Sequence, residues 1–193
     1  FDTTLVGMLT LNFGVPALIF STLTNLDVSP AEFGKISGIF GIFLLANLMI
    51  GALFLRLFRL EIGAFLPALS FPNNGNMGLP LCLFAFGPEG LALGISIFVM
   101  SSIFSFTVGW SIYAGRLAAD VLYNNPLIYA VGAALIFMVT EAEPPVWLAN
   151  TTELIGGLAI PLMLVSLGVA IANMRAKGAV FIFVVCTIKL SAG

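Results

Sequence analysis

Long apolar runs, separated by short polar connections, occupy most of the chain. The longer runs reach the roughly 20 residues that a helix needs to cross the hydrocarbon core of a bilayer. They lack the alternating pattern that is typical of an outer-membrane barrel. The pattern therefore predicts an all-α integral membrane bundle. The predicted spans are residues 4–24, 33–55, 62–86, 90–113, 126–140, 147–172 and an incomplete one from residue 179.

Turn residues set the predicted boundaries of several helices. Ser29 or Pro30 is predicted to begin a helix, because both residue types are frequent at helix starts. Residues 141–145, which contain two prolines, are predicted to form a turn. Residues 150–152 (Asn-Thr-Thr) are interpreted as another helix start, before Glu153.

Composition supports the fold class and narrows the partners. The chain of 193 residues is 60% hydrophobic and 8% charged, with a mean hydropathy of +1.14. These values are too apolar for a soluble surface, so the lipid bilayer is the predicted partner. No basic run is present that could hold nucleic acid. Cys82 and Cys186 have apolar neighbours and are assigned to packing.

One polar segment interrupts the apolar pattern, at residues 71–80 (Phe-Pro-Asn-Asn-Gly-Asn-Met-Gly-Leu-Pro). The apolar arms on its two sides, residues 62–71 and 79–86, are each too short to cross a bilayer alone. Together with the segment they are long enough for one broken crossing, at about 1.5 Å per residue. The alternative is a re-entrant hairpin that enters and leaves on the same face.

The basic residues favour the crossing over the hairpin. If the segment crosses, five basic residues share one side and only Lys35 lies opposite; if it is a hairpin, the split is two against four. Because Lys and Arg in short loops favour the cytoplasmic side, the crossing is the predicted topology. The basic residues of the loops predicted to be cytoplasmic are Arg56, Arg59, Arg116, Arg175 and Lys177.

The polar segment has the residue types expected of a solute site. Two prolines remove backbone donors and two glycines permit non-helical dihedral angles, so polar backbone groups are freed where bulk water is absent. Asparagine side chains can then pair with the freed backbone or with a solute. Pro80 suits the first turn of a helix, whose positive end favours a carboxylate. In the alternative interpretation, the asparagines only cap the break.

A faint internal repeat suggests a transporter architecture. Residues 15–21 align without gaps on residues 160–166, at an offset of 145. The two copies fall on predicted spans that cross in opposite directions, as an inverted repeat requires. The alternative is two independent proline kinks, because proline recurs by chance in membrane helices. The predicted helix breaks are Pro16, Pro72, Pro80 and Pro161.

Lone hydroxyl groups within the spans, such as those of Ser21, Ser70 and Ser166, are expected to bond to their own helix or to a neighbour. Ser21 and Ser166 occupy repeat-related positions where a scaffold could face the solute. They are therefore added to the predicted site. The predicted substrate-binding residues are Asn73, Asn74, Gly75, Asn76, Met77, Gly78, Pro80, Ser21 and Ser166.

Four motifs occur in order along the chain: residues 13–20 (FGVPALIF), 72–81 (PNNGNMGLPL), 125–128 (NPLI) and 156–162 (GGLAIPL). In this order they resemble the auxin efflux carrier family in its bacterial form, over essentially the whole chain. The resemblance implies a ten-helix fold of two inverted five-helix repeats. The chain is then expected to be a fragment with the second to seventh helices and part of the eighth.

The resemblance also implies what the helices do. Residues 1–30 and 124–174 would belong to a scaffold, and residues 31–116 and 178–193 to a moving transport domain. The implied function is an efflux carrier, secondary or facilitative, for small organic anions such as weak carboxylic acids. The implied location is the bacterial inner membrane, with a possible homodimer through the scaffold helices.

Two other functions use the same broken helix: an ion or solute channel, and a non-transporting membrane receptor. An enzyme is not predicted, because the chain has no histidine and the spans show neither an acid pair nor a metal-ligand cluster. Accordingly no catalytic residue, metal or cofactor is predicted. None of the nine acidic residues falls at mid-membrane, so coupling to protons or sodium stays open.

Overall fold

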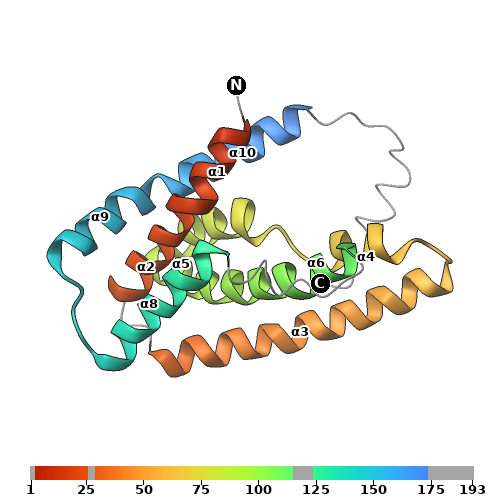
Figure 1. The fold of residues 1–193 in the computed structure, drawn as a ribbon, viewed down its shortest axis with the longest axis horizontal. Coiled ribbons are helices and arrows are strands. Elements are labelled where there is room, and N and C mark those ends of the chain that lie inside the picture. Colours follow the sequence, from red (N-terminus) through yellow and green to blue (C-terminus); the bar gives the residue numbers. More distant parts are fainter. Residues whose placement is uncertain (1–2, 26–28, 115–123, 174–193) are drawn as a thin grey trace.

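The computed structural model describes residues 3–25, 29–114 and 124–173. All regular structure in these residues is helical, as the sequence predicts (Figure 1). The elements, with η denoting a π-helical turn, are α1 (Thr3–Leu9), η1 (Thr10–Gly14), α2 (Val15–Asn25), α3 (Pro30–Leu57), α4 (Ile62–Ser70), η2 (Asn74–Gly78), α5 (Leu79–Phe104), η3 (Ser105–Gly109), α6 (Trp110–Ala114), α8 (Pro126–Thr140), α9 (Val146–Gly157) and α10 (Ala159–Asn173).

Four helical stretches in this part of the chain are long and apolar enough to cross a membrane. α8 is a shorter apolar helix, and the predicted span from residue 179 lies outside the described residues. The fold is thus that of an all-α protein embedded in a membrane. The four stretches are Thr4–Asn25, Pro30–Leu57, Ile62–Tyr113 and Val146–Asn173.

The start of α3 confirms the prediction made from Ser29 and Pro30. The hydroxyl oxygen of Ser29 accepts a hydrogen bond from the Glu32 N–H at 3.1 Å, and Glu32 Oε2 accepts one from the Ser29 N–H at 3.3 Å. This reciprocal capping box satisfies two backbone donors, and Pro30 follows in the first turn, where its missing N–H costs nothing.

α3 is apolar on every side. One face, which includes Leu44 and Leu48, is buried against the rest of the protein. The opposite face exposes Ile42 and Met49, whose exposed fractions are 71% and 74%. A helix with no polar face suits a lipid environment, because hydrocarbon tails cover the outer side chains without a hydrophobic penalty.

The contacts along α3 define the path of the interrupted segment. Near the end of α3, a Cβ added to Gly51 would lie 3.0 Å from Leu66 Cδ1, on α4. Near its start, Ser37 Oγ donates to the Ser96 carbonyl at 3.1 Å, on α5. Between these contacts the chain turns back at Gly87, whose φ of +70° suits glycine. Residues 62–86 therefore run alongside α3 in the opposite direction, and whether they cross a bilayer or form a hairpin within it stays a prediction.

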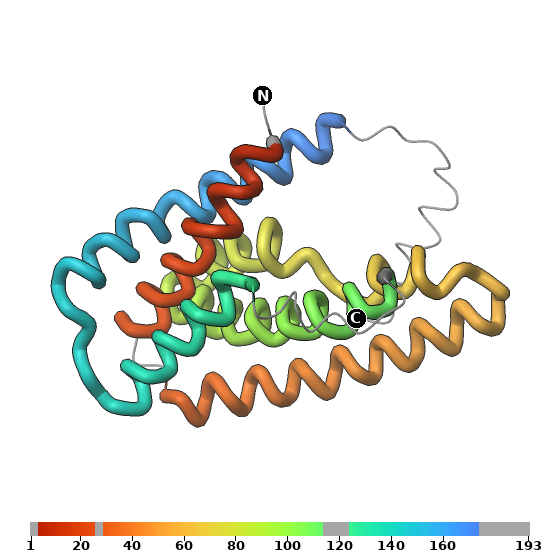
Figure 2. The backbone as a smooth tube through the Cα atoms, viewed as in Figure 1, coloured from red at the N-terminus to blue at the C-terminus, as the bar shows by residue number. Residues whose placement is uncertain are grey.

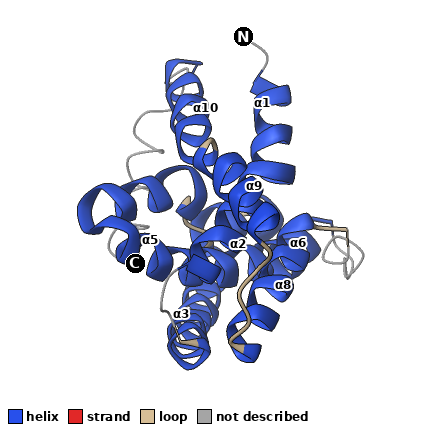
Figure 3. Cartoon of the chain, turned by 90° about the vertical axis from the view of Figure 1, so that its left-hand side faces the viewer, coloured by secondary structure: helices blue, strands red, loops and turns tan. Residues whose placement is uncertain are grey.

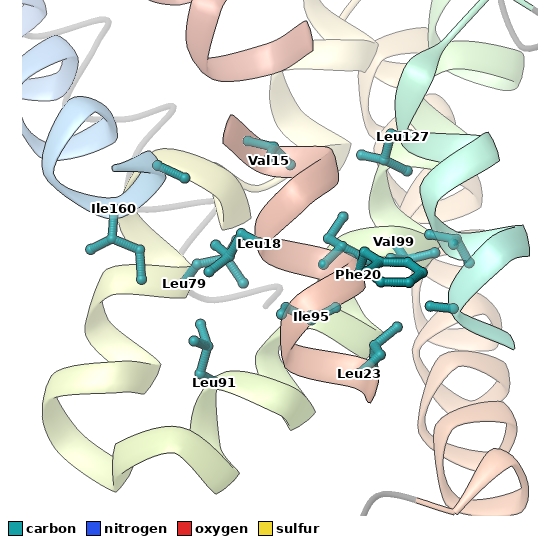
Figure 4. Close-up of a cluster of buried hydrophobic side chains, with 14 of the residues drawn as sticks. Val15, Leu18, Phe20, Leu23, Leu79, Leu91, Ile95, Val99, Leu127 and Ile160 are labelled. Atoms are coloured by element: carbon teal, nitrogen blue, oxygen red, sulfur yellow. The ribbon is translucent and has the colours of Figure 1, made fainter. Parts of the chain in front are cut away.

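The main hydrophobic core lies where α2, α5, α8 and α10 meet (Figure 4). Leu79, the first residue of α5, is 1% exposed and belongs to this cluster together with Leu18 of α2. In a bilayer such a cluster is stabilised by the close packing of its side chains. The core therefore anchors the start of α5, directly after the polar segment. Figure 3 shows α1 and α10 projecting from one end of the molecule, opposite α3.

The amino-terminal and carboxy-terminal described helices cross each other (Figure 1, red and blue). A Cβ added to Gly14 would lie 3.3 Å from Ala159 Cβ, and one added to Gly156 would lie 2.8 Å from Leu18 Cα. As one chain advances the other recedes, so the two helices are antiparallel. Gly14 and Ala159 are separated by 145 residues, the offset of the predicted repeat.

Pro16 and Pro161, predicted as helix breaks, interrupt their helices only slightly. The π-helical turn η1 comes directly before α2, in which Pro16 is the second residue. Leu158 alone separates α9 from α10, and its carbonyl accepts from the Leu162 N–H at 3.1 Å. The bonding pattern shifts by one residue before Pro16, the bond across Pro161 is an ordinary α-helical one, and both helices continue.

The interpretation of residues 150–152 as a helix start is wrong, because α9 already begins at Val146. Pro144 and Pro145 end the preceding turn instead. Both threonine hydroxyls bond back to carbonyls of the same helix, with Thr151 Oγ1 donating to the Trp147 carbonyl at 2.6 Å. Such back-bonding satisfies the hydroxyl within a helix, so the polar triplet leaves the helix intact.

Candidate functional site

The apolar helix α4 is interrupted after Ser70, and the chain is extended at Phe71 (φ −99°, ψ 115°). Figure 2 shows this stretch as an uncoiled piece of yellow tube. Helical structure resumes at Asn74, as η2, and continues into α5. The non-helical part is therefore confined to residues 71–73, shorter than the predicted break at residues 72–80.

The π-helical geometry of η2 shifts the backbone pairing by one residue. The Gly78 N–H donates to the Asn73 carbonyl at 3.3 Å, and the Leu79 N–H donates to the Asn74 carbonyl, each five residues back. Pro80 follows, with no N–H to donate. The first N–H groups of the run that starts at Asn74 have no partner within the helix, and the side chain of the N-cap residue Asn73 does not cap them. They form the positive end of a helix dipole.

A cavity of about 200 Å³ lies beside this interrupted helix. Residues 71–76 form one wall, and α5 and η3 form the facing wall. None of the described lining residues is charged. The lining residues outside the break are Leu11, Phe98, Ser101, Ser102, Ser105 and Phe106.

Asn74 is the polar residue of the break with the clearest unmet bonding capacity. Its Nδ2 atom is buried and has no hydrogen-bond partner in the described part of the chain. A buried donor without an acceptor costs about 1–3 kcal/mol. Asn74 itself lines the cavity. Asn73 is exposed and Asn76 is half-buried, and both line the same cavity.

The facing wall carries three serines that the sequence analysis missed. Ser101 and Ser102 are 4% and 8% exposed, yet both line the cavity, as does Ser105. Their Oγ atoms make no hydrogen bond with any residue that the structure describes. The available signal was their spacing, because residues 101, 102 and 105 fall on one side of the helical run.

The cavity brings together only part of the predicted site. Asn73, Asn74, Gly75 and Asn76 line it, and so does Pro72. The remaining residues of the polar segment are not among the lining residues, because the helix has already turned them away from the cavity. The Met77 side chain is 57% exposed, and Pro80 is fully buried. Gly78 lies beside Asn74, since a Cβ added to it would be 3.6 Å from Asn74 Cβ.

Ser21 and Ser166 also lie outside the lining of this cavity. Ser21 Oγ donates to the Leu18 carbonyl at 3.2 Å, which is the predicted bond within its own helix. The same expectation is wrong for Ser166 and Ser70, whose buried hydroxyls have no partner among the described residues. Ser166 is carried by α10, which packs against η2. Its predicted contact with a solute stays a prediction.

All three π-helical turns in the described residues reach this cavity. η1 contributes Leu11, η2 contributes residues 74–76, and η3 contributes Ser105 and Phe106. Short π-helical turns are frequent at functional sites. Their convergence singles out the cavity as the candidate site.

These features define a helical membrane protein in which an interrupted helix borders a cavity lined by asparagines, serines and apolar side chains, none of the described ones charged. Among the described residues, no group of three or more His, Cys, Asp or Glu side chains could hold a metal ion. No family model matches the chain, and neither does any curated protein or solved structure.

Proposed function

We propose that this protein is a carrier for small organic anions, related to the auxin efflux carriers, that binds its solute at the interrupted helix. One observation supports this most directly: the break at residues 71–73 borders a cavity that Asn74 also lines, and the buried Asn74 Nδ2 atom has no partner among the described residues. Irregular backbone at membrane depth is tolerated mainly where it lines a cavity or is buried in protein.

The chemistry of the cavity favours a carboxylate-bearing solute. The unpaired N–H groups at the start of η2 and the Asn74 amide all donate hydrogen bonds, and the helix dipole adds positive potential there. The three serine hydroxyls of the facing wall donate or accept as the solute requires. Without a charged residue in the described lining, binding would be moderate, as suits a carrier that must release its solute.

The grouping of the helices supports alternating access. α2 packs against α8 and α9, and α1 packs against α10, which gives one group. α3 packs against α4 and α5, and α4 packs against α6, which gives another. The groups meet where α10 contacts η2 and where α2 contacts α5. We assign the first group to the scaffold and the second to the transport domain, so that the solute site lies at their boundary.

Further parts of the proposal follow from the resemblance and the charge pattern. Residues 62–86 cross the bilayer as one broken helix, within a ten-helix inverted-repeat fold. The α3 end with Arg56 and Arg59 faces the cytoplasm of a bacterial inner membrane, and the scaffold helices form a homodimer. The antiparallel crossing at Gly14 and Ala159 is the arrangement expected near the axis of an inverted repeat.

Counterflow in proteoliposomes tests the proposal, with the natural gene product that carries these residues. Radiolabelled indole-3-acetate and malonate serve as probes of an aromatic and a dicarboxylic acid. We expect saturable counterflow of at least one acid, and its loss when Asn74→Ala is combined with Asn76→Ala. Each lost hydrogen bond to a charged group weakens binding by about 1.5–3 kcal/mol.

The control removes two asparagines elsewhere, with Asn150→Ala and Asn173→Ala, because both side chains are exposed on α9 and α10. This control should retain full counterflow. Counterflow that survives the Asn74 and Asn76 changes would reduce these side chains to helix caps. Flux that does not saturate would indicate a channel, and binding without flux would indicate a receptor.

A further inference from the structure

A second cavity, of about 490 Å³, adjoins the cavity at the break. It lies between η1, the start of α8 and the α5–η3 region. Four residues line both cavities, so the two spaces share a wall. The shared residues are Leu11, Phe98, Ser102 and Phe106.

The far side of this second cavity is polar without being charged. Asn12 of η1 and Asn124 line it, together with the first residues of α8. Asn125 caps that helix, because its Oδ1 accepts from the Leu127 N–H at 3.0 Å. The positive end of α8, a helix of 15 residues, is therefore directed at the cavity.

Ser102 provides an independent indication of a ligand. Its side chain is 8% exposed, it lines both cavities, and its Oγ makes no hydrogen bond with the described residues. Ser96, on the same helix, shows the usual alternative: it is also buried, and its Oγ donates to the Ala92 carbonyl at 3.2 Å. A buried hydroxyl that forgoes this back-bond, and instead borders two cavities, is available to a polar ligand.

We propose that the second cavity is a separate compartment for the transported acid, reached from the break across Ser102 between the rings of Phe98 and Phe106. This inference rests on the proposed carrier function and adds a second binding position to it. The carboxylate would lie near Asn12 and the start of α8, where amide donors and the helix dipole favour an anion. The apolar part of the acid would lie against the two phenylalanine rings.

Single cysteines measure whether water and the acid reach this compartment. In a background with Cys82→Ala and Cys186→Ala, the introduced residues are Asn12→Cys for the second cavity, Ser101→Cys for the first and Ser102→Cys for both. Ser96→Cys is the matched control on α5. The reagent is the membrane-impermeant 2-sulfonatoethyl methanethiosulfonate, applied to proteoliposomes with and without saturating indole-3-acetate or malonate.

We expect modification at residues 12, 101 and 102 and none at residue 96. A transported acid should slow modification at residues 12 and 102 by at least fivefold. Modification of residue 12 that neither acid slows would overturn the proposal, because the cavity would then hold water and no solute. Absence of modification at residue 12, with residue 101 modified, would also overturn it.

Counterflow by the same preparations separates this inference from the proposed function. If counterflow depends on Asn74 and Asn76 while residue 12 is never protected, the carrier stands and the second compartment fails. If residue 12 is protected but counterflow is absent, the compartment stands as a binding site and the carrier function fails.

Discussion

The helix that contains Pro16 and the segment that contains Pro72 face the same problem, because each proline removes a backbone donor from an apolar helix. Around Pro16 the helix continues through the single π-helical turn η1. Around Pro72 the helix ends, three residues are non-helical, and a cavity of about 200 Å³ lies alongside. The difference lies in what packs against each proline.

At the crossing near Pro16, another backbone fills the space. Gly14 meets Ala159, and Gly156 meets Leu18 so closely that an added Cβ would lie 2.8 Å from its backbone nitrogen. Small residues at such crossings allow helices to approach without lipid or water between them. The hydroxyl of Ser21 in this region bonds within its own helix.

At the break near Pro72, the neighbouring contacts are made by aromatic side chains, whereas at the crossing near Pro16 they are made by backbone atoms. The Phe71 ring covers Gly109, since a Cβ added there would lie 2.7 Å from Phe71 Cε2. The Phe98 ring approaches Gly75 in the same way, at 3.0 Å. Asn74 lines the cavity next to these rings, and its Nδ2 atom has no hydrogen-bond partner in the part of the chain that the structure describes. A proline in an apolar helix therefore borders a cavity only where the neighbouring residues do not pack against the backbone around it.

Adding a methyl group at the packed crossing should have the largest effect on stability. In Gly156→Ala, the new methyl group would meet the backbone of Leu18, which cannot turn aside as a side chain can. Overpacking of this kind costs about 1–3 kcal/mol. We expect a melting temperature lower by several degrees in detergent, measured by tryptophan fluorescence, together with a lower yield.

The adjacent Gly157 supplies the control for that change. A Cβ added to Gly157 has no neighbouring atom within 4 Å, so Gly157→Ala should leave the melting temperature unchanged or slightly raised. Equal melting temperatures for Gly156→Ala and Gly157→Ala would contradict this prediction, because the crossing would then have room for an added methyl group.

A change of intermediate effect targets the ring that covers the break. Gly109→Ala should displace Phe71 and with it the first residues of the break, because the methyl group and the ring cannot share the space. A cost of about 1–3 kcal/mol in the bound geometry corresponds to about 5-fold to 150-fold in affinity. Counterflow should then show a half-saturation concentration raised by about tenfold, since about 1.4 kcal/mol is tenfold.

Rescue distinguishes this local effect from general misfolding. Adding Phe71→Leu to Gly109→Ala should restore part of the affinity, because the smaller side chain leaves room for the methyl group. Gly132→Ala, on α8, is the control, since nothing lies within 4 Å of its added Cβ. A raised half-saturation concentration in Gly132→Ala would show that the assay reports packing anywhere in the protein.

The sequence predicts the helices well because their signals are local. The helix start at Ser29 depends on a few adjacent residues, and it lies where the pattern places it. Residues 150–152 misled the prediction, because threonines that bond back to their own helix resemble a helix cap in sequence.

The site itself is only half visible in the sequence. The sequence predicts one wall of the cavity, because the polar residues 73–76 interrupt an apolar run. The facing wall depends on how α5 turns back at Gly87, which brings Ser101 and Ser102 opposite the break. The π-helical turns are equally hidden, since a shift of one residue in the backbone bonding leaves no mark in composition.

The smallest expected change in stability comes from removing one serine hydroxyl in each region. The two hydroxyls differ in their hydrogen bonding. Ser70, at the edge of the break, is fully buried and its Oγ has no partner among the described residues, whereas Ser21 bonds to Leu18. Ser70→Ala removes an unsatisfied group and should raise the free energy of unfolding by up to about 1 kcal/mol, whereas Ser21→Ala should lower it by about 0.5–1.5 kcal/mol. Paired thermal-unfolding curves in one detergent measure both changes. If both variants lose stability alike, the break satisfies its polar groups as fully as the crossing does, and the contrast between the two regions reduces to shape alone.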